Sequence, residues 1–553
     1  MLYISELIGE KYRTWGKGKV FLTAPTGLGK TTFILSELLP YLQARKKKLL
    51  ILCNRKLLRD QYWYAAVQKF DNYGELASAV DIMTYQSLAE VLKNDGSLKD
   101  VLFGYEVICC DEAHYFYADS DFNGFGTYVM LQALILTGLS RQMIFMSGTM
   151  KEVQPLISQT LKAAIEKRKS QLPYFPYEEY GREYMLDFSY LADYSRFECY
   201  YSEDIDTLCD VIAKDRKKTV FFIDNKKRAA EIKEKCIKQG KLNSAQIKIF
   251  NAENLEENCN QETVKKLVMC NSLEPQILIT TSVLDNGVSI QDEEVGNAVI
   301  VTDSQISFLQ MLGRIRAGYG ERIKLIFLLR DVKEFEKKEL KYEKDVHRIE
   351  EIDNIPIDLK RFKFLSVVWE QSDVELADFY RKILVCTKRE FECYLGTSKK
   401  AELAYGDSKF CINNFAKEKI GNDYLLTSRF HVLAMKDSKN VIYEQMKWIG
   451  KEKGELAELT SDYWEKRRAE YRKDLLIPQK FTNEQMQEWK ISLTEQHRKI
   501  FFSDIVEKNG SFSKEKLKKI LARESMELIE DDSDGRKTYS IEEVIGVLTR
   551  EKD

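Results

Sequence analysis

The chain has 553 residues, of which 44% are hydrophobic, and this apolar content excludes an intrinsically disordered protein and suffices for several cores. Lysine and arginine number 85 against 87 aspartate and glutamate residues, so no bulk positive charge points to a polyanion partner, and any nucleic-acid affinity must be local. The 11 cysteines form no Cys-x-x-Cys pair and the four histidines lie far apart, which argues against a zinc ribbon, an iron–sulfur cluster or a disulfide framework.

This composition fits a reducing cytosol, and we expect a cytoplasmic protein with no membrane partner. No stretch reaches the ~18 uninterrupted apolar residues of a membrane span. At ~150 residues per domain, the length suggests three or four domains.

The first part of the chain alternates short apolar runs with segments of helical spacing. The apolar runs occupy residues 19–23, 48–53, 107–110 and 143–146. An apolar run that ends at polar residues is typical of a buried strand in a parallel sheet. We therefore predict a parallel α/β domain over residues 1–185.

A phosphate-binding loop follows the first predicted strand. The segment Ala24-Pro-Thr-Gly-Leu-Gly-Lys-Thr31 matches the loop motif except that alanine replaces its first glycine, and it precedes a predicted helix. Successive backbone N–H groups at a helix N-terminus suit phosphate oxygens, Lys30 would reach the β- and γ-phosphates, and the Thr31 hydroxyl would ligate Mg²⁺. The candidate nucleotide-binding residues here are Thr26, Gly27, Leu28, Gly29, Lys30, Thr31 and Thr32.

Two adjacent carboxylates follow the third predicted strand, in Asp111-Glu112-Ala113-His114. The carboxyl end of a strand is where α/β proteins build ligand sites. We expect Asp111 to hold Mg²⁺ and Glu112 to orient and deprotonate the water that attacks the γ-phosphate. Alone, Asp-Glu after a strand would more often be a solvated turn, but the phosphate loop reverses that preference.

A second set of apolar runs lies at residues 219–223, 277–280, 298–301 and 323–329, after a Tyr-rich stretch, 151–191, that is expected to be mostly helical. We predict a second α/β domain over residues 186–335. The remainder, 336–553, is charged and is expected to form an α-helical accessory region, with a small subdomain within 480–553. Its segment from Ser511 to Val544 is expected to be helical and to be a candidate for docking a protein partner.

Short motifs in a fixed order carry a resemblance to a known family. Besides the phosphate loop and the Asp-Glu-Ala-His segment, the sequence contains six further short motifs: Cys53–Gln61, Thr84-Tyr-Gln86, Ser147-Gly-Thr149, Phe222-Ile-Asp224, Thr281–Gly287 and Gln310–Arg316. Each piece alone would more often be an ordinary loop, but the order makes coincidence improbable. The chain resembles superfamily 2 helicases of the DEAH type. In its overall composition it resembles the helicases that are encoded by bacterial chromosomes, phages and mobile elements.

The resemblance implies two tandem RecA-like domains that bind ATP and Mg²⁺ between them. It implies that Gln310, Arg314 and Arg316 act from the second domain on the phosphates, and that Gly287 contacts the nucleotide. It assigns nucleic-acid contacts to Arg55, Thr84 and Thr281, with DNA favoured over RNA and single strands over duplex. It makes His114, Ser147 and Thr149 the residues that couple hydrolysis to nucleic-acid binding.

Two departures from the family pattern leave alternatives open. Ala317 stands where the last arginine of the family's motif is expected, so Arg316 either reaches the phosphate from one residue earlier or is a solvated helix residue. Only 22 residues separate Gly287 from Gln310, which leaves little room for a strand-separating hairpin. ATP-driven translocation is thus better supported than unwinding.

The sequence therefore predicts a nucleic-acid-stimulated ATPase that acts as a helicase or translocase. One rival is a duplex translocase that never separates strands. A rival of another class is a nucleotide-gated binding or scaffold subunit of a larger nucleoprotein assembly.

Overall fold

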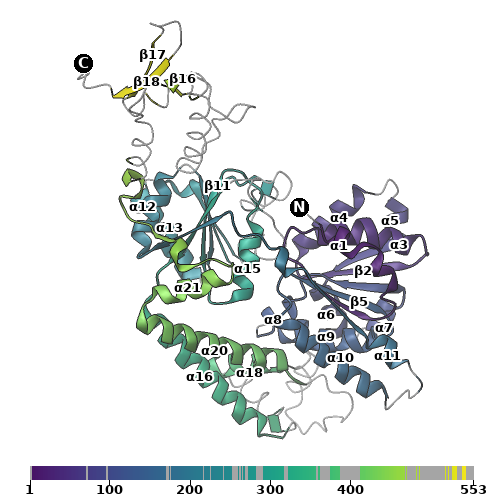
Figure 1. The fold of residues 1–553 in the computed structure, drawn as a ribbon. Coiled ribbons are helices and arrows are strands. Elements are labelled where there is room, and N and C mark those ends of the chain that lie inside the picture. The colour runs from purple at the N-terminus through teal and green to yellow at the C-terminus, as the bar shows by residue number, and fades with distance from the viewer. Residues whose placement is uncertain are drawn as a thin grey trace.

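The computed structural model of the chain contains two parallel β-sheets, a helical arm and a small C-terminal sheet (Figure 1). The residues that the structure describes are 3–69, 73–94, 97–121, 123–169, 174, 176–215, 217–223, 226–240, 242–251, 260, 263, 266–267, 272–281, 290–316, 322–356, 359–360, 374–385, 411–466, 469, 481–482, 485, 517–518, 521, 526–531 and 538–543.

The first sheet has six parallel strands in the order β3-β2-β4-β5-β1-β6. These strands are β1 (Lys19–Thr23), β2 (Lys48–Cys53), β3 (Val80–Thr84), β4 (Tyr105–Cys110), β5 (Gln142–Ser147) and β6 (Glu183–Asp187). Because all of them run the same way, their carboxyl ends lie at one edge, where the predicted phosphate loop and the acidic pair follow β1 and β4.

Helices cover both faces of this sheet because alternate strand residues point to opposite sides. Val20 and Leu22 pack into one core, whereas Phe21 between them packs into the other. The first face carries α1 (Ile4–Ile8), α2 (Lys30–Phe33), α3 (Leu39–Gln43), α4 (Lys56–Val67) and α5 (Tyr73–Ala79). The second carries α6 (Tyr85–Lys93), α7 (Leu98–Leu102), α8 (Tyr115–Ala118), α9 (Met130–Thr137) and α10 (Val153–Lys169).

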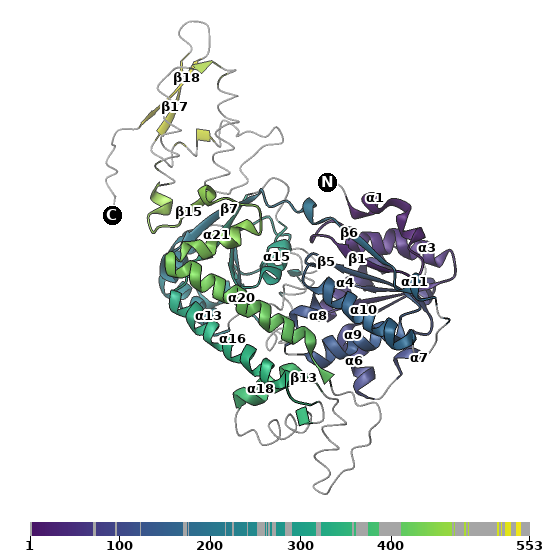
Figure 2. The same ribbon diagram turned by 60° about the horizontal axis from the view of Figure 1, so that its bottom comes forward.

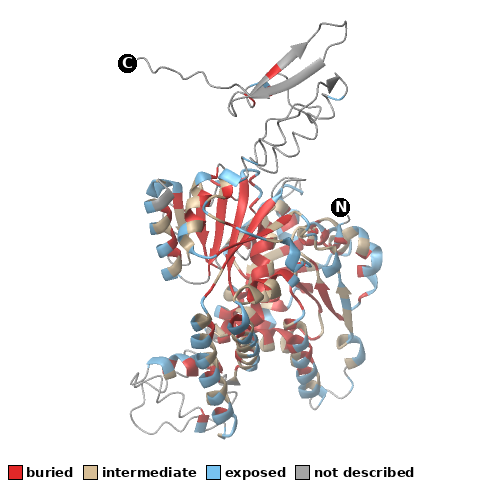
Figure 3. Ribbon diagram, turned by 60° about the vertical axis from the view of Figure 1, so that its left-hand side comes forward, coloured by how far each residue is buried: buried red, intermediate tan, exposed pale blue. Residues whose placement is uncertain are grey.

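The second sheet has seven parallel strands in the order β15-β7-β12-β11-β8-β10-β9. They are β7 (Phe197–Ser202), β8 (Lys218–Ile223), β9 (Ile247–Phe250), β10 (Ile277–Thr280), β11 (Val295–Val301), β12 (Ile323–Leu328) and β15 (Leu456–Glu458). Its two faces pack against α12 (Ile205–Lys214) with α13 (Lys226–Gly240), and against α15 (Gln305–Arg314) with α21 (Lys439–Lys447). The central strands of both sheets are buried (Figure 3).

The predicted fold class, two tandem α/β domains built on parallel sheets, is confirmed. The stretch 151–191, expected to be mostly helical, also contains the strand β6. This strand forms an edge of the sheet and is only partly buried, so its sequence lacks the continuous apolar run that marks a central strand.

A helical arm, which we define as α16 (Val332–Asp353), α18 (Val374–Ile383) and α20 (Asn414–Lys436), joins the two domains (Figure 2). The helices α16 and α20 lie side by side and antiparallel, because Phe335 packs on Phe430 at one end and Ile352 packs near Ile420 at the other. At the start of α20, Phe415 enters the core of the first domain and packs on Tyr128 at a ring distance of 5.1 Å. The arm therefore contacts the first domain although it begins directly after β12 of the second.

The C-terminal part contains a three-stranded antiparallel sheet of β16 (Phe481–Thr482), β18 (Thr538–Glu543) and β17 (Met526–Asp531). The expectation of a helical subdomain between Ser511 and Val544 is therefore wrong for residues 526–531 and 538–543. Residues 538–542 alternate polar and apolar side chains, and an Asp-Gly pair lies between the two segments in the sequence, which is a hairpin signal.

Within the residues described, no helix combines the length and the apolar character that crossing a membrane requires.

Candidate nucleotide-binding site

The phosphate loop connects β1 to α2 at the carboxyl edge of the first sheet. Gly29 caps α2 with φ of +85°, a left-handed conformation that glycine adopts without steric cost. Lys30 begins the helix, is 9% exposed, and its Nζ donates a hydrogen bond of 3.0 Å to the carbonyl of Ala24. The seven predicted residues, Thr26 to Thr32, thus form a loop that leads into a helix N-terminus, the geometry that suits an anion.

The two predicted carboxylates follow β4 and are both buried, with 3% exposure each. Asp111 accepts a hydrogen bond of 2.9 Å at Oδ1 from the backbone N–H of Glu112. Glu112 has φ of +51°, which a residue with a Cβ adopts only under strain, and such strain clusters at functional sites. The backbone turns here so that Asp111 and Glu112 point to different partners.

The environment separates the pKa values of the two carboxyl groups. Burial, reinforced by the charge of Glu112, raises the pKa of Asp111, and Lys30 opposes this shift. Burial would also raise the pKa of Glu112, but Lys30, His114 and Arg314 together lower it well below its usual range. The site therefore favours the ionised form of Glu112 more strongly than that of Asp111.

A series of polar contacts leads from Glu112 to the loop after β5. His114 Nδ1 lies 3.4 Å from Glu112 Oε2 and 3.0 Å from Ser147 Oγ. Ser147 Oγ also accepts a bond of 3.0 Å from the backbone N–H of Thr149. The three residues that were predicted to couple hydrolysis to nucleic-acid binding, His114, Ser147 and Thr149, thus contact one another and the acidic pair.

The series of side-chain contacts continues into the second domain and returns to Glu112. Gln310 Nε2 donates to Thr149 Oγ1 at 3.2 Å, and its Oε1 accepts from Arg314 Nη2 at 3.3 Å. Arg314 Nη2 also donates to Glu112 Oε1 at 2.9 Å. We call this closed network of Glu112, His114, Ser147, Thr149, Gln310 and Arg314 the interdomain ring.

Arg316 lies against the phosphate loop from the second domain. A Cβ on Gly27 would lie 3.6 Å from its Nε, and this Nε is buried with no hydrogen-bond partner among the described residues. Burial, together with Arg314 and Arg196, lowers the pKa of Arg316 to about 10. Of the two alternatives for Arg316, the geometry favours a guanidinium that faces the phosphate loop over a solvated helix residue.

The two domains are in tight contact where α15 meets the phosphate loop. A Cβ on Gly313 would lie 2.9 Å from Thr26 Oγ1, so only glycine fits at this contact. Sequence reasoning missed Gly313 as an interface residue, although it sits inside the predicted motif between Gln310 and Arg316.

The predicted nucleic-acid contacts are divided between the domains. Arg55 precedes α4, with Nη2 3.5 Å from Asp119 Oδ2, and Thr84 caps α6 by accepting from the N–H of Ser87 at 3.1 Å. Both lie at the carboxyl ends of the neighbouring strands β2 and β3. Thr281 follows β10 in the other domain and is 9% exposed. The predicted nucleotide contact Gly287, with residues 282–286, and also Asp224 and Ala317, lie outside the described residues.

Two tyrosines that sequence reasoning missed contact Asp111. The hydroxyl of Tyr62 on α4 donates to Asp111 Oδ2 at 2.7 Å, and the hydroxyl of Tyr85 on α6 donates to the backbone carbonyl of Asp111 at 2.8 Å. Their spacing in the sequence is that of ordinary buried helix residues, so no local pattern marks them.

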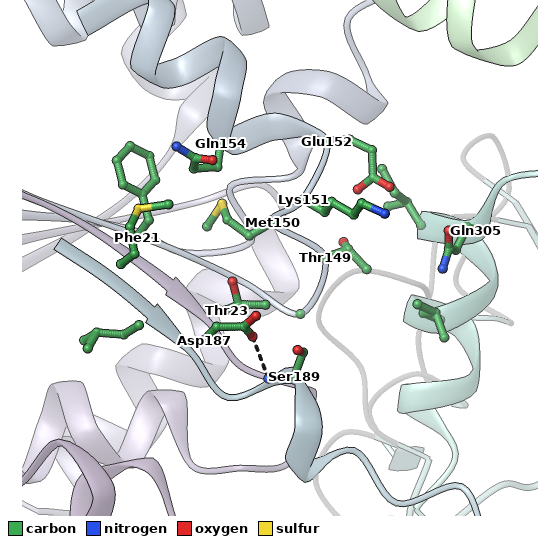
Figure 4. A pocket seen from close by; sticks show the side chains of 15 residues that line it. Phe21, Thr23, Thr149, Met150, Lys151, Glu152, Gln154, Asp187, Ser189 and Gln305 are labelled. Carbon is green, nitrogen blue, oxygen red and sulfur yellow. Dashed lines mark hydrogen bonds between the residues drawn. The ribbon is translucent and has the colours of Figure 1, made fainter. Parts of the chain in front are cut away.

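An interdomain cavity of about 510 Å³ lies beside the interdomain ring (Figure 4). Its walls come from β1 and β6, from the loop after β5 that carries Thr149 and Lys151, and from Gln305, Ile306 and Leu309 of α15. Because α15 also carries Gln310 and Arg314, the cavity lies between elements whose spacing sets the geometry of the ring.

The residues present fit a nucleotide with Mg²⁺. The buried Nε of Arg316 has a hydrogen to donate, and the space over Gly27 would be filled by any side chain at that position. Thr31 and Asp111 offer the hydroxyl and carboxylate oxygens that Mg²⁺ prefers. Asp111 accepts a hydrogen bond from the hydroxyl of Tyr62, and Thr31 lies near the same hydroxyl.

Comparison with known proteins gives one family match. Residues 4–152 match the family described as type III restriction enzyme, res subunit, which covers most of the first α/β domain. No curated protein sequence matches the chain.

Solved structures similar to the chain include Dbp5 of S. cerevisiae bound to RNA and ADP BeF3, with 14% identity and a TM-score of 0.39, over 57% of this chain and 79% of that one. They also include the E. coli DEAH/RHA helicase HrpB, with 15% identity and a TM-score of 0.38, over 60% of this chain and 43% of that one.

Proposed function

We propose that the chain is a superfamily 2 helicase or translocase of the DEAH type that hydrolyses ATP under stimulation by nucleic acid. The observation that carries this proposal is the interdomain ring, which joins the acidic pair of the first domain to Gln310 and Arg314 of the second. The family match of residues 4–152 supports a helicase-type ATPase of this superfamily. The order of motifs in both domains supports the same assignment.

In the proposed reaction the protein positions groups and neutralises charge, because phosphoryl transfer needs little covalent help. Lys30 and Arg316 approach the phosphate loop from the first and the second domain. Thr31 and Asp111 would hold Mg²⁺, which supplies positive charge to the phosphate oxygens. Glu112, held ionised, orients the attacking water and accepts its proton.

Arg314 links the reaction to the closing of the two domains. It comes from α15 yet reaches Glu112, so its charge is near the phosphates only while the domains are together. With Arg55 and Thr84 on one domain and Thr281 on the other as nucleic-acid contacts, closing and opening shift one contact set relative to the other. We propose single-stranded DNA as the favoured polymer and the cytoplasm as the compartment.

The test is steady-state ATP hydrolysis by the full chain without polymer and with single-stranded DNA, duplex DNA or single-stranded RNA, beside Lys30→Ala. We expect one polymer to stimulate ATP hydrolysis by the unmodified chain but not by Lys30→Ala. The stimulating polymer is then the nucleic acid on which the protein acts. Stimulation by duplex without unwinding of a forked substrate would favour the duplex translocase. A flat response to every polymer would overturn the proposal and favour a nucleotide-gated scaffold subunit.

A further inference from the structure

The side chain of Asp111 is held by a tyrosine hydroxyl. Tyr62 is 1% exposed, and its Oη donates to Asp111 Oδ2 at 2.7 Å. A carboxylate oxygen accepts, so the phenol hydroxyl is the donor in this contact. Thr31 lies near the same hydroxyl, so Tyr62 is close to both side chains proposed to hold Mg²⁺.

The backbone of Asp111 is held by a second tyrosine. Tyr85 is fully buried, and its Oη donates to the carbonyl oxygen of Asp111 at 2.8 Å. Its ring stacks on Tyr115 with centroids 5.1 Å apart and planes 5° apart, which fixes the direction of the hydroxyl. Side chain and backbone of the same aspartate are thus fixed by two different helices.

Each of these helices begins at a proposed nucleic-acid contact. Arg55 is the N-cap of α4, the helix that carries Tyr62 about two turns later. Thr84 is the N-cap of α6, and Tyr85 is the first residue of that helix. Because a helix moves nearly as a rigid body, a displacement at Arg55 or Thr84 moves the hydroxyl that contacts Asp111.

We propose that Tyr62 and Tyr85 are positioning residues that transmit occupancy of the nucleic-acid contacts at Arg55 and Thr84 to the Mg²⁺-holding carboxylate of Asp111. This inference rests on the proposed function. It gives a physical path for stimulation within the first domain, separate from the interdomain ring. Neither tyrosine touches the polymer or the phosphates in this arrangement; both act through Asp111.

The competing interpretation is that both tyrosines only stabilise the core. Removing either hydroxyl would then lower the melting temperature and leave the Mg²⁺ dependence and the response to polymer unchanged. A positioning role instead changes the affinity for Mg²⁺, because Asp111 loses a donor that fixes its carboxylate. The two interpretations differ in a measurable quantity other than turnover.

The experiment compares Tyr62→Phe and Tyr85→Phe with Tyr128→Phe in the full chain. Tyr128 is a matched control because it is a buried tyrosine of the same domain whose hydroxyl accepts a bond of 3.1 Å from Asn414, away from Asp111. The first readout is the Mg²⁺ concentration for half-maximal binding of a fluorescent non-hydrolysable ATP analogue. The second is the ratio of ATPase rates with and without the stimulating polymer.

We expect Tyr62→Phe to raise the half-maximal Mg²⁺ concentration about tenfold, and both variants to lower the stimulation ratio by a similar factor, while Tyr128→Phe changes neither. Unchanged Mg²⁺ dependence and stimulation in both variants would overturn the proposal. If no polymer stimulates ATP hydrolysis by the unmodified chain, the proposed function is wrong, and so is the transmitting role of the two tyrosines. The Mg²⁺ titration still decides whether Tyr62 positions Asp111.

Discussion

Arg314 of the second domain and Glu112 of the first form an ion pair of 2.9 Å in which the two side chains are only 5% and 4% exposed. Such a buried pair gains little net stability, because both charges lose their water, but breaking it leaves one charge uncompensated. The pair therefore serves mainly to define how the domains meet. It also adds to Lys30 and His114 in lowering the pKa of Glu112, the proposed catalytic carboxylate.

We expect Glu112→Gln to lower ATP hydrolysis at least ~100-fold while nucleotide binding persists, because the amide cannot accept the proton of the attacking water. Arg314→Ala should lower hydrolysis and also the melting temperature, because it leaves Glu112 buried without its guanidinium partner. Phosphate release, fluorescent-nucleotide binding and thermal unfolding measure these effects. Full activity in Glu112→Gln would contradict the role given to this carboxylate.

Arg316→Ala is expected to lower kcat about 100-fold or more, because the guanidinium that faces Gly27 is lost from the phosphate loop. Arg316→Lys should recover little of this activity, since lysine lacks the planar fork of donors. Steady-state kinetics provide the measurement. Arg322→Ala is the matched control, because Arg322 pairs with Glu198 on the surface and is 52% exposed. An equal change of kcat in Arg316→Ala and Arg322→Ala would contradict the role given to Arg316.

Gly313→Ala should weaken the approach of the two domains, because its Cβ would lie 2.9 Å from Thr26 Oγ1 and 3.1 Å from Thr26 Cβ. We expect the rate of hydrolysis to fall about tenfold, as for an overpacked contact, with both domains still folded. The same change at Gly421 of α20 meets nothing within 4 Å and is the control. ATPase rates and small-angle scattering with a bound analogue compare the two variants. A Gly313→Ala protein that closes and turns over normally would contradict the tight contact.

Asp423 of α20 gives the arm a pH dependence. Burial raises the pKa of Asp423 to about 6, with Asp121 and Asp303 adding to the shift and Lys419 opposing it. Because the folded state then binds more protons than the unfolded state above the usual aspartate pKa, the free energy of unfolding falls as pH rises toward 6 and stays reduced above it.

Asp423→Asn should therefore be more stable than the unmodified chain at pH 7.5, by roughly 1–3 kcal/mol. The difference should shrink as the pH falls to 4, where the aspartate is protonated. Urea unfolding at several pH values provides the measurement. A variant that is destabilised equally at pH 4 and pH 7.5 would show that the charge of Asp423 is not the cause.

The central strands of both sheets could be predicted from the sequence because they are buried on both faces. The apolar runs at 19–23 and 48–53 coincide with β1 and β2, and the run at 277–280 coincides with β10. The edge strands β3, β6, β9 and β15 were not predicted, since one face or end of an edge strand is exposed and carries polar residues. The strand β7, which lies beside β15 and is mostly buried, was not predicted either. The C-terminal strands β17 and β18 were mistaken for helix because the segment is charged and only β18 shows a short two-residue alternation.

For the candidate site, the sequence predicted the residues but not their contacts. Motif order pointed to Glu112, Thr149, Gln310 and Arg314, yet the interdomain ring depends on how α15 docks against the first domain, which no local pattern encodes. Tyr62 was missed for the same reason, because its partner Asp111 lies 49 positions away along the chain.

The attachment of Phe415 in the core of the first domain has a mechanical consequence. The chain already joins the two domains between β6 and β7, and the arm adds a second attachment at Phe415 and at α8, where Asn422 donates to the hydroxyl of Tyr117. Two bodies held at two separate points keep one easy degree of freedom, rotation about the line through those points. Sliding and complete separation of the domains are therefore both resisted, and we expect any opening of the proposed nucleotide site to be a rotation about this line.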